Sequence, residues 1–82
     1  MPRVVVSGSS LHRLTGGVSE FEVTATNFHR LLRELEARFP GLGQQVEEGM
    51  AVAIDGTIYQ DAYGAQIGPD SEVYLIPKIG GG

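Results

Sequence analysis

The chain contains no cysteine, and long apolar runs are missing as well. Without cysteine, disulfides, thiolate metal sites and a cysteine nucleophile are excluded together. Any sulfur chemistry must then proceed without a side-chain thiol. No apolar stretch approaches the ~20 residues that span a bilayer, and the N-terminus carries no signal-peptide pattern. We therefore expect a cytoplasmic protein that has no membrane partner.

Positive charge is also scarce. The chain contains six Lys and Arg residues and ten Asp and Glu residues, which gives a formal net charge of −4, and the cations form no run. Non-specific binding to nucleic acid requires clustered cations that displace counterions from phosphates. We therefore expect no nucleic-acid partner.

Residues suited to catalysis or metal binding are few. His12 and His29 are far apart in sequence and have no cysteine or acidic neighbour at metal-ligand spacing, so we predict no metal site and expect His29 on the surface. Thr15-Gly16-Gly17 lacks the lysine of a phosphate-binding loop, and Glu47-Glu48 is an adjacent acidic pair whose side chains do not converge. The sequence predicts neither a self-contained enzyme nor a bound cofactor.

The chain length allows one small domain, which we place at residues 1–82 with residues 78–82 as a flexible tail. Residues 3–7 contain Val4-Val5-Val6, a β-branched run typical of a strand. Residues 18–23 alternate apolar and charged side chains, which predicts a second strand with one wet face. We expect the two strands to form a hairpin, with residues 11–14 in its long loop.

One amphipathic helix dominates the middle of the chain. Its apolar stripe recurs at helical spacing and consists of Phe28, Leu31, Leu32, Leu35 and Phe39. Thr26 or Asn27 provides the N-cap, and Pro40-Gly41 ends the helix. We expect ion pairs of Glu34 with Arg30 and with Arg38 on the outer face.

The second half of the chain is predicted as strands and turns. Residues 44–49 are assigned to a loop, 50–55 to a strand, Asp55-Gly56 to a hairpin turn, 57–59 to a short strand and 72–77 to the last strand. The fold class is α+β, with a mixed sheet of four to five strands packed on one main helix. If the first and last strands are parallel and central, the arrangement is a β-grasp.

Strand alternation also predicts an apolar surface. One face of the sheet, turned away from the helix, would carry Ala51, Ala53, Tyr74 and Ile76, with Ile79 extending it toward the C-terminus. Scattered exposed hydrophobic residues are normal, but a contiguous patch indicates a docking site. We expect partners to dock here.

The chain ends in Gly80-Gly81-Gly82. Glycines have no side chain and can pass through a channel too narrow for other residues; three of them reach about 10 Å. The terminal carboxyl is an anion at neutral pH and a poor electrophile, because its reference pKa is about 3.3–3.7. A partner must therefore activate it before it reacts. The alternative is that the glycines are an inert, frayed end.

Taken together, the sequence resembles the MoaD/ThiS family of ubiquitin-like sulfur-carrier proteins. The resemblance covers most of the chain and rests on residues 31–35 (LLREL), 38–42 (RFPGL), 52–56 (VAIDG) and 72–77 (EVYLIP) before the terminal glycines. The ending from Pro77 to Gly82 is more similar to the small subunit of molybdopterin synthase than to the thiamine carrier. Two departures are a third glycine and Asp70-Ser71 where the family often has Gly-Asp; Ser71 can still hydrogen-bond that turn.

The resemblance implies a function without an internal catalytic group. A ubiquitin-activating-type enzyme would use ATP to adenylate Gly82, and a sulfur donor would convert the adenylate into a thiocarboxylate. Gly80 and Gly81 would thread the tail into the partner's site, and a synthase subunit would accept the sulfur for cofactor synthesis, with molybdopterin as the first expectation and thiamine or another thio-metabolite as alternatives. A protein modifier joined through Gly82 and a plain interaction domain are the other classes.

Overall fold

The structure is a computed structural model that describes residues 1–59 and 64–77, and only the backbone of residues 9–11 and 77. The described elements, in chain order, are β1 (Arg3–Val6), α1 (Ser9–Leu14), β2 (Glu20–Glu22), α2 (Phe28–Arg38), α3 (Leu42–Gly49), β3 (Met50–Ile54), β4 (Thr57–Tyr59) and β5 (Glu72–Pro77). The predicted tail, residues 78–82, lies outside the described residues.

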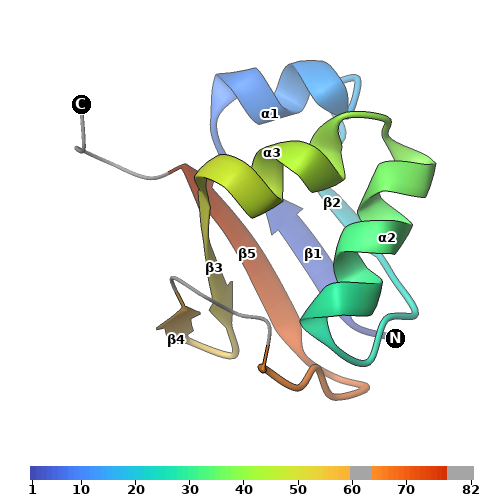
Figure 1. The fold of residues 1–82 in the computed structure, drawn as a ribbon, viewed down its shortest axis with the longest axis vertical. Helices are drawn as coiled ribbons and strands as arrows, with labels where there is room; N and C mark the ends of the chain where they lie inside the picture. The colour runs from blue at the N-terminus through green and yellow to red at the C-terminus, as the bar shows by residue number, and fades with distance from the viewer. Residues whose placement is uncertain (60–63, 78–82) are drawn as a thin grey trace.

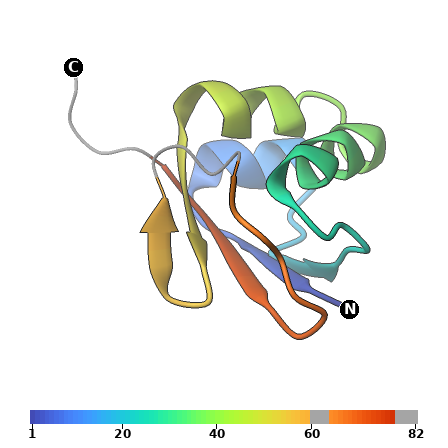
Figure 2. The ribbon, with the colours of Figure 1, turned by 60° about the horizontal axis from the view of Figure 1, so that its bottom comes forward.

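The strands form one five-stranded mixed sheet in the order β2-β1-β5-β3-β4. β1 and β5 are parallel and lie beside each other in the interior of the sheet, and the remaining neighbours are antiparallel. Figures 1 and 2 show the helices on one side of this sheet. The predicted α+β, β-grasp architecture, with its parallel pair of first and last strands, is therefore confirmed.

The core lies between the helices and the sheet. Leu31 and Leu35 of α2 are fully buried, as are Val4 of β1 and Val73 and Leu75 of β5. The predicted stripe of α2 thus faces the sheet, as an amphipathic helix requires. The start of α2 is fixed by Asn27, whose Oδ1 accepts a 2.9 Å hydrogen bond from the Arg30 amide.

Residues 9–14 form helix α1, so the prediction of a loop for residues 11–14 was wrong. The helix follows Gly8, which has a positive φ of 97°. His12 Nε2 lies 3.1 Å from the Val6 carbonyl oxygen, and Leu14 packs against the core. These contacts join α1 to the end of β1. The helix is too short to show an apolar period in the sequence.

Residues 44–49 belong to helix α3, so the prediction of a loop there was wrong, while α2 remains the longest helix. Leu42 and Val46 lie one turn apart and are almost completely buried. The Glu36 carboxylate accepts hydrogen bonds from the amides of Gly41 (2.7 Å) and Gln44 (3.2 Å). These bonds satisfy amides at the start of α3, and the bond from Gly41, followed by that from Gln44, lowers the pKa of Glu36.

The surface of α2 differs from the prediction in one ion pair. Glu34 lies 3.9 Å from Arg38, as expected, but no ion pair joins it to Arg30. Both Glu34 oxygens instead accept hydrogen bonds from the Thr24 amide, at 3.0 and 3.1 Å, and Oε1 also accepts one from its hydroxyl. Glu34 therefore fastens α2 to the segment that follows β2.

Candidate functional site

The helices leave one face of the sheet uncovered, and we call it the open face (Figure 2). Strand register brings one residue from each of the five strands into a row across it, in the order Glu20, Val5, Tyr74, Ala53 and Ile58. Four of these five residues are apolar. Ile58 is 65% exposed and Tyr74 is 37% exposed, so partners can reach them.

The next row of the open face lies closer to the end of β5. Ala51 pairs with Ile76, and both side chains are partly exposed. Beyond them, Met50 pairs with Pro77, the last described residue of β5. The apolar part of the open face therefore adjoins the point where the chain continues into residues 78–82.

The opposite end of the open face is charged. Arg3 forms an ion pair with Glu20 at 3.2 Å and a second one with Glu72 on the neighbouring strand β5. The hydrogen bond and charge of Glu72 raise the pKa of Arg3 above its ordinary value. Exposed ion pairs contribute little to stability, but they give this end of the sheet a polar surface. The apolar surface of the open face is consequently concentrated at the end near residue 77.

The predicted docking residues have different exposures. Tyr74 is exposed and Ile76 and Ala51 are partly exposed, whereas Ala53 is only 7% exposed. Ala53 lies on the open face as predicted, but its methyl group stands in the row between the larger Tyr74 and Ile58 and offers little exposed area. Its role in docking stays a prediction. Ile79, Gly80, Gly81 and Gly82 lie outside the described residues.

Two residues of the open face were missed in the sequence. Val5 is the central residue of Val4-Val5-Val6, and strand alternation turns it away from the core when its neighbours face inward. Ile58 lies between Thr57 and Tyr59 and follows the same rule, since Tyr59 packs against the core. The period of two was present in both segments. It was hidden in one by three identical valines and in the other by the short length of the strand.

The described residues contain neither a candidate metal site nor a helix that could span a membrane. No three His, Cys, Asp or Glu side chains among them are placed to hold a metal ion. None of the helices described is long and apolar enough to cross a bilayer. His29 is exposed, as expected, and His12 is partly buried at the end of β1.

The model of the ThiS family matches residues 9–82, which includes the terminal glycines. This chain belongs to the ThiS family. The sequence resemblance to MoaD/ThiS sulfur carriers is thereby confirmed. A comparison with curated protein sequences gave no match.

Three solved structures share the ThiS-like fold of this chain. Mycobacterium tuberculosis CysO, described as an antigen, has a TM-score of 0.83 at 13% identity, covering 96% of this chain and 100% of that one. A chain of the Amycolatopsis orientalis BexX/CysO complex has a TM-score of 0.82 at 18% identity and covers 100% of both. SAMP1 from Haloferax volcanii has a TM-score of 0.76 at 19% identity, covering 99% of this chain and 98% of that one. At these identities the likeness concerns the fold.

Proposed function

We propose that this ThiS-family carrier transports sulfur as a thiocarboxylate on Gly82, for the synthesis of molybdopterin. The observation that carries the carrier role is the family match, which runs through the terminal glycines. The choice of molybdopterin is supported by the similarity of residues 77–82 to the end of the small subunit of molybdopterin synthase. The absence of cysteine from the chain is compatible with it, because the sulfur is held on the backbone carboxyl group and needs no side-chain thiol.

The chemistry requires an enzyme that activates the carboxylate. A carboxylate oxygen of Gly82 attacks the α-phosphate of ATP, which releases pyrophosphate and leaves an acyl-adenylate. Sulfide (HS⁻) supplied by the sulfur donor then attacks the acyl carbon and expels AMP, and loss of the S–H proton leaves the thiocarboxylate on Gly82. The activating enzyme, of the ubiquitin-activating type, binds the ATP, and this chain is its protein co-substrate. A synthase subunit finally accepts the sulfur.

The open face supplies the docking surface in this proposal. Its apolar end, formed by Val5, Tyr74, Ile76 and Ile58, adjoins the last described residue of β5. A partner that covers this surface would receive the tail, residues 78–82, directly beside its contact area. Docking at a fixed distance from the reactive carboxyl would give precise positioning without a catalytic residue in the carrier. The cytoplasmic location stays a prediction.

The test is an intact-mass measurement after incubation with the cognate activating enzyme, ATP and a sulfide source. The expected result is a mass increase equal to the replacement of one oxygen by sulfur. A matched variant, Gly81→Ala, places a methyl group in the threaded segment and should reduce this conversion while leaving the melting temperature unchanged. No conversion of the unaltered chain, by an enzyme proved active on another carrier, would contradict the proposal.

The same experiment separates the other classes. An activated Gly82 can also react with an amine, so adducts on the lysines of other proteins would show a modifier instead of a carrier. Conversion followed by transfer to a thiazole acceptor, and not to a molybdopterin precursor, would change the receiving pathway to thiamine. If neither conversion nor adducts are observed, the remaining class is an interaction domain with inert glycines.

A further inference from the structure

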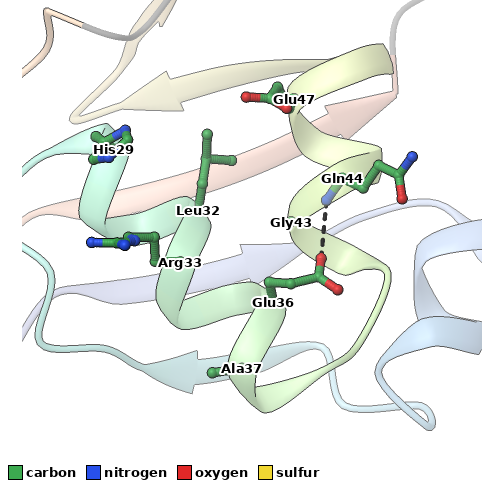
Figure 3. Close-up of a pocket in the computed structure, with 8 residues that line it drawn as sticks. All are labelled: His29, Leu32, Arg33, Glu36, Ala37, Gly43, Gln44 and Glu47. Carbon is green, nitrogen blue, oxygen red and sulfur yellow. Dashed lines mark hydrogen bonds between the residues drawn. The ribbon is translucent and has the colours of Figure 1, made fainter.

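Two shallow clefts meet on the outer side of α2, on the face of the molecule opposite the open face of the sheet. One lies between α2 and α3 and has a volume of about 610 Å³ (Figure 3). The other, of about 560 Å³, lies between α2 and residues 24–26. His29 and Arg33 line both clefts, so the two form one continuous surface along the helix.

The cleft beside residues 24–26 is lined by two arginines that have no carboxylate partner in the described part of the chain. Arg30 and Arg33 are exposed and three residues apart, and among the described residues neither forms an ion pair. Arg3 and Arg38 differ, because each contacts a carboxylate. Each guanidinium carries five N–H donors arranged to bind carboxylates or phosphates.

Among the residues that the structure describes, Glu34 is the one carboxylate that lines this cleft, and its oxygens already accept hydrogen bonds. They accept three hydrogen bonds from the amide and hydroxyl of Thr24, and Oε2 lies 3.9 Å from Arg38. Glu34 therefore does not neutralise Arg30 or Arg33 by direct contact. In a chain of net charge −4, these neighbouring arginines form a local surface of opposite sign.

The cleft between α2 and α3 is apolar at its base. Leu32, Ala37 and Gly43 contribute to its lining, and Leu32 is only 9% exposed. Figure 3 shows Glu36 directed toward α3, where it bonds to the Gln44 amide, and Arg33 directed away from α3. Glu47 also lines the cleft, on the α3 side. An apolar ligand group therefore fits beside α3, and an acidic one fits beside Arg33 and Arg30.

We propose that this surface of α2 binds an acidic segment of a partner protein in which a large apolar residue accompanies the carboxylates. The charge of Arg30 and Arg33 complements the carboxylates, and the adjoining apolar cleft distinguishes a peptide from a small phosphate, which would use the cationic cleft alone. The inference does not depend on Gly82. Because the surface and the open face lie on opposite sides of the molecule, two partners can bind at once.

The test is an NMR titration of the full chain, in which backbone amide chemical shifts are recorded while a peptide with glutamates on both sides of a leucine is added. The expected chemical-shift changes lie at residues 29–37 and 43–44, and added salt should reduce them. The double variant Arg30→Gln, Arg33→Gln should bind the peptide roughly tenfold more weakly, which corresponds to about 1.4 kcal/mol. Arg13→Gln, at an exposed arginine of α1, is the matched control and should bind normally.

The proposal is overturned by an absence of peptide binding, whether or not inorganic pyrophosphate binds instead. It is also overturned by equal binding of the double variant or by shifts confined to the open face. If the same amides shift with protein concentration alone, the occupant is a second copy and not an acidic partner. Gln preserves helix propensity, and unchanged melting of the double variant verifies that its fold is intact.

Discussion

The Ser71 hydroxyl donates a 2.7 Å hydrogen bond to Asp55 Oδ2, which joins the turn before β5 to the turn after β3. The same hydroxyl accepts a 2.8 Å bond from the Gly68 amide, and Asp55 Oδ1 accepts one of 2.9 Å from the Glu72 amide. Ser71 is almost completely buried, whereas Asp55 is exposed. The two side chains thus fix the entry of the strand that leads to the C-terminal tail.

Ser71→Ala is expected to lower the free energy of unfolding by about 1 kcal/mol, because the Gly68 amide loses its acceptor. Denaturant unfolding of the variant and of the unaltered chain measures the difference. Asp70→Ala is the neighbouring control, since Asp70 is exposed and forms no hydrogen bond or ion pair with the described residues. Equal losses for both variants would show that the bond between Ser71 and Asp55 has no special role.

Stability should depend on pH through Asp55. The bond from Ser71, and then that from the Glu72 amide, lower the pKa of Asp55 below its ordinary value of 3.8. A carboxyl group with a lower pKa in the folded state stabilises the fold when ionised, so this contribution is present above the unfolded pKa and is lost as the pH falls through the folded one. Glu36, with a pKa lowered by the amides of α3, should act in the same direction.

The measurement is the melting temperature at pH 7 and at a pH below the folded pKa. We expect Asp55→Asn to lose part of the pH dependence of the unaltered chain, with a larger difference between the two proteins at pH 7 than in acid. Asp70→Asn should follow the unaltered chain. A constant difference between Asp55→Asn and the unaltered chain at every pH would contradict the assignment.

The open face and the core face of β5 should respond differently to substitution. Leu75 is fully buried, and Leu75→Ala should reduce the free energy of unfolding by about 2–5 kcal/mol. Ile58→Asp, at a side chain that is 65% exposed, should change stability by less than about 1 kcal/mol but weaken binding to the activating enzyme. Ile76→Asp should act like Ile58→Asp. Normal enzyme binding by both aspartate variants would exclude the open face as the docking surface.

The sequence predicted correctly those elements in which a helical or strand period of apolar residues repeats several times. The stripe of α2 and the alternation of β5 placed Leu35, Val73 and Leu75 in the core, and Ser71 was identified as a bonding residue of its turn. α3 was missed because only Leu42 and Val46 mark its buried side, and its first turn is capped by Glu36 from another helix. A cap provided by tertiary contact has no local signal.

The position of the open face was predicted from strand alternation, but the exposure of its individual residues was not. Alternation assigned Tyr74 and Ile76 to the open face, but it could not show that Ala53 is covered, since that depends on which residues flank it across the sheet. The cationic surface of α2 was also hidden. Glu34 was expected to neutralise Arg30, and the sequence does not show that Thr24 occupies its oxygens.

The contact between α2 and α3 depends on a glycine whose replacement should be costly. A Cβ atom at Gly43 would lie 2.6 Å from the Leu32 carbonyl oxygen and 3.0 Å from Glu36 Cβ. Backbone cannot yield as a flexible side chain does, so Gly43→Ala must push α3 away from α2 and should destabilise the fold by about 1–3 kcal/mol. Gly49→Ala is the matched control, because no atom of the described residues lies within 4 Å of a Cβ there. Alanine is the better helix former, so this control should unfold at the same or higher denaturant concentration, and equal destabilisation by both variants would refute the close helix contact.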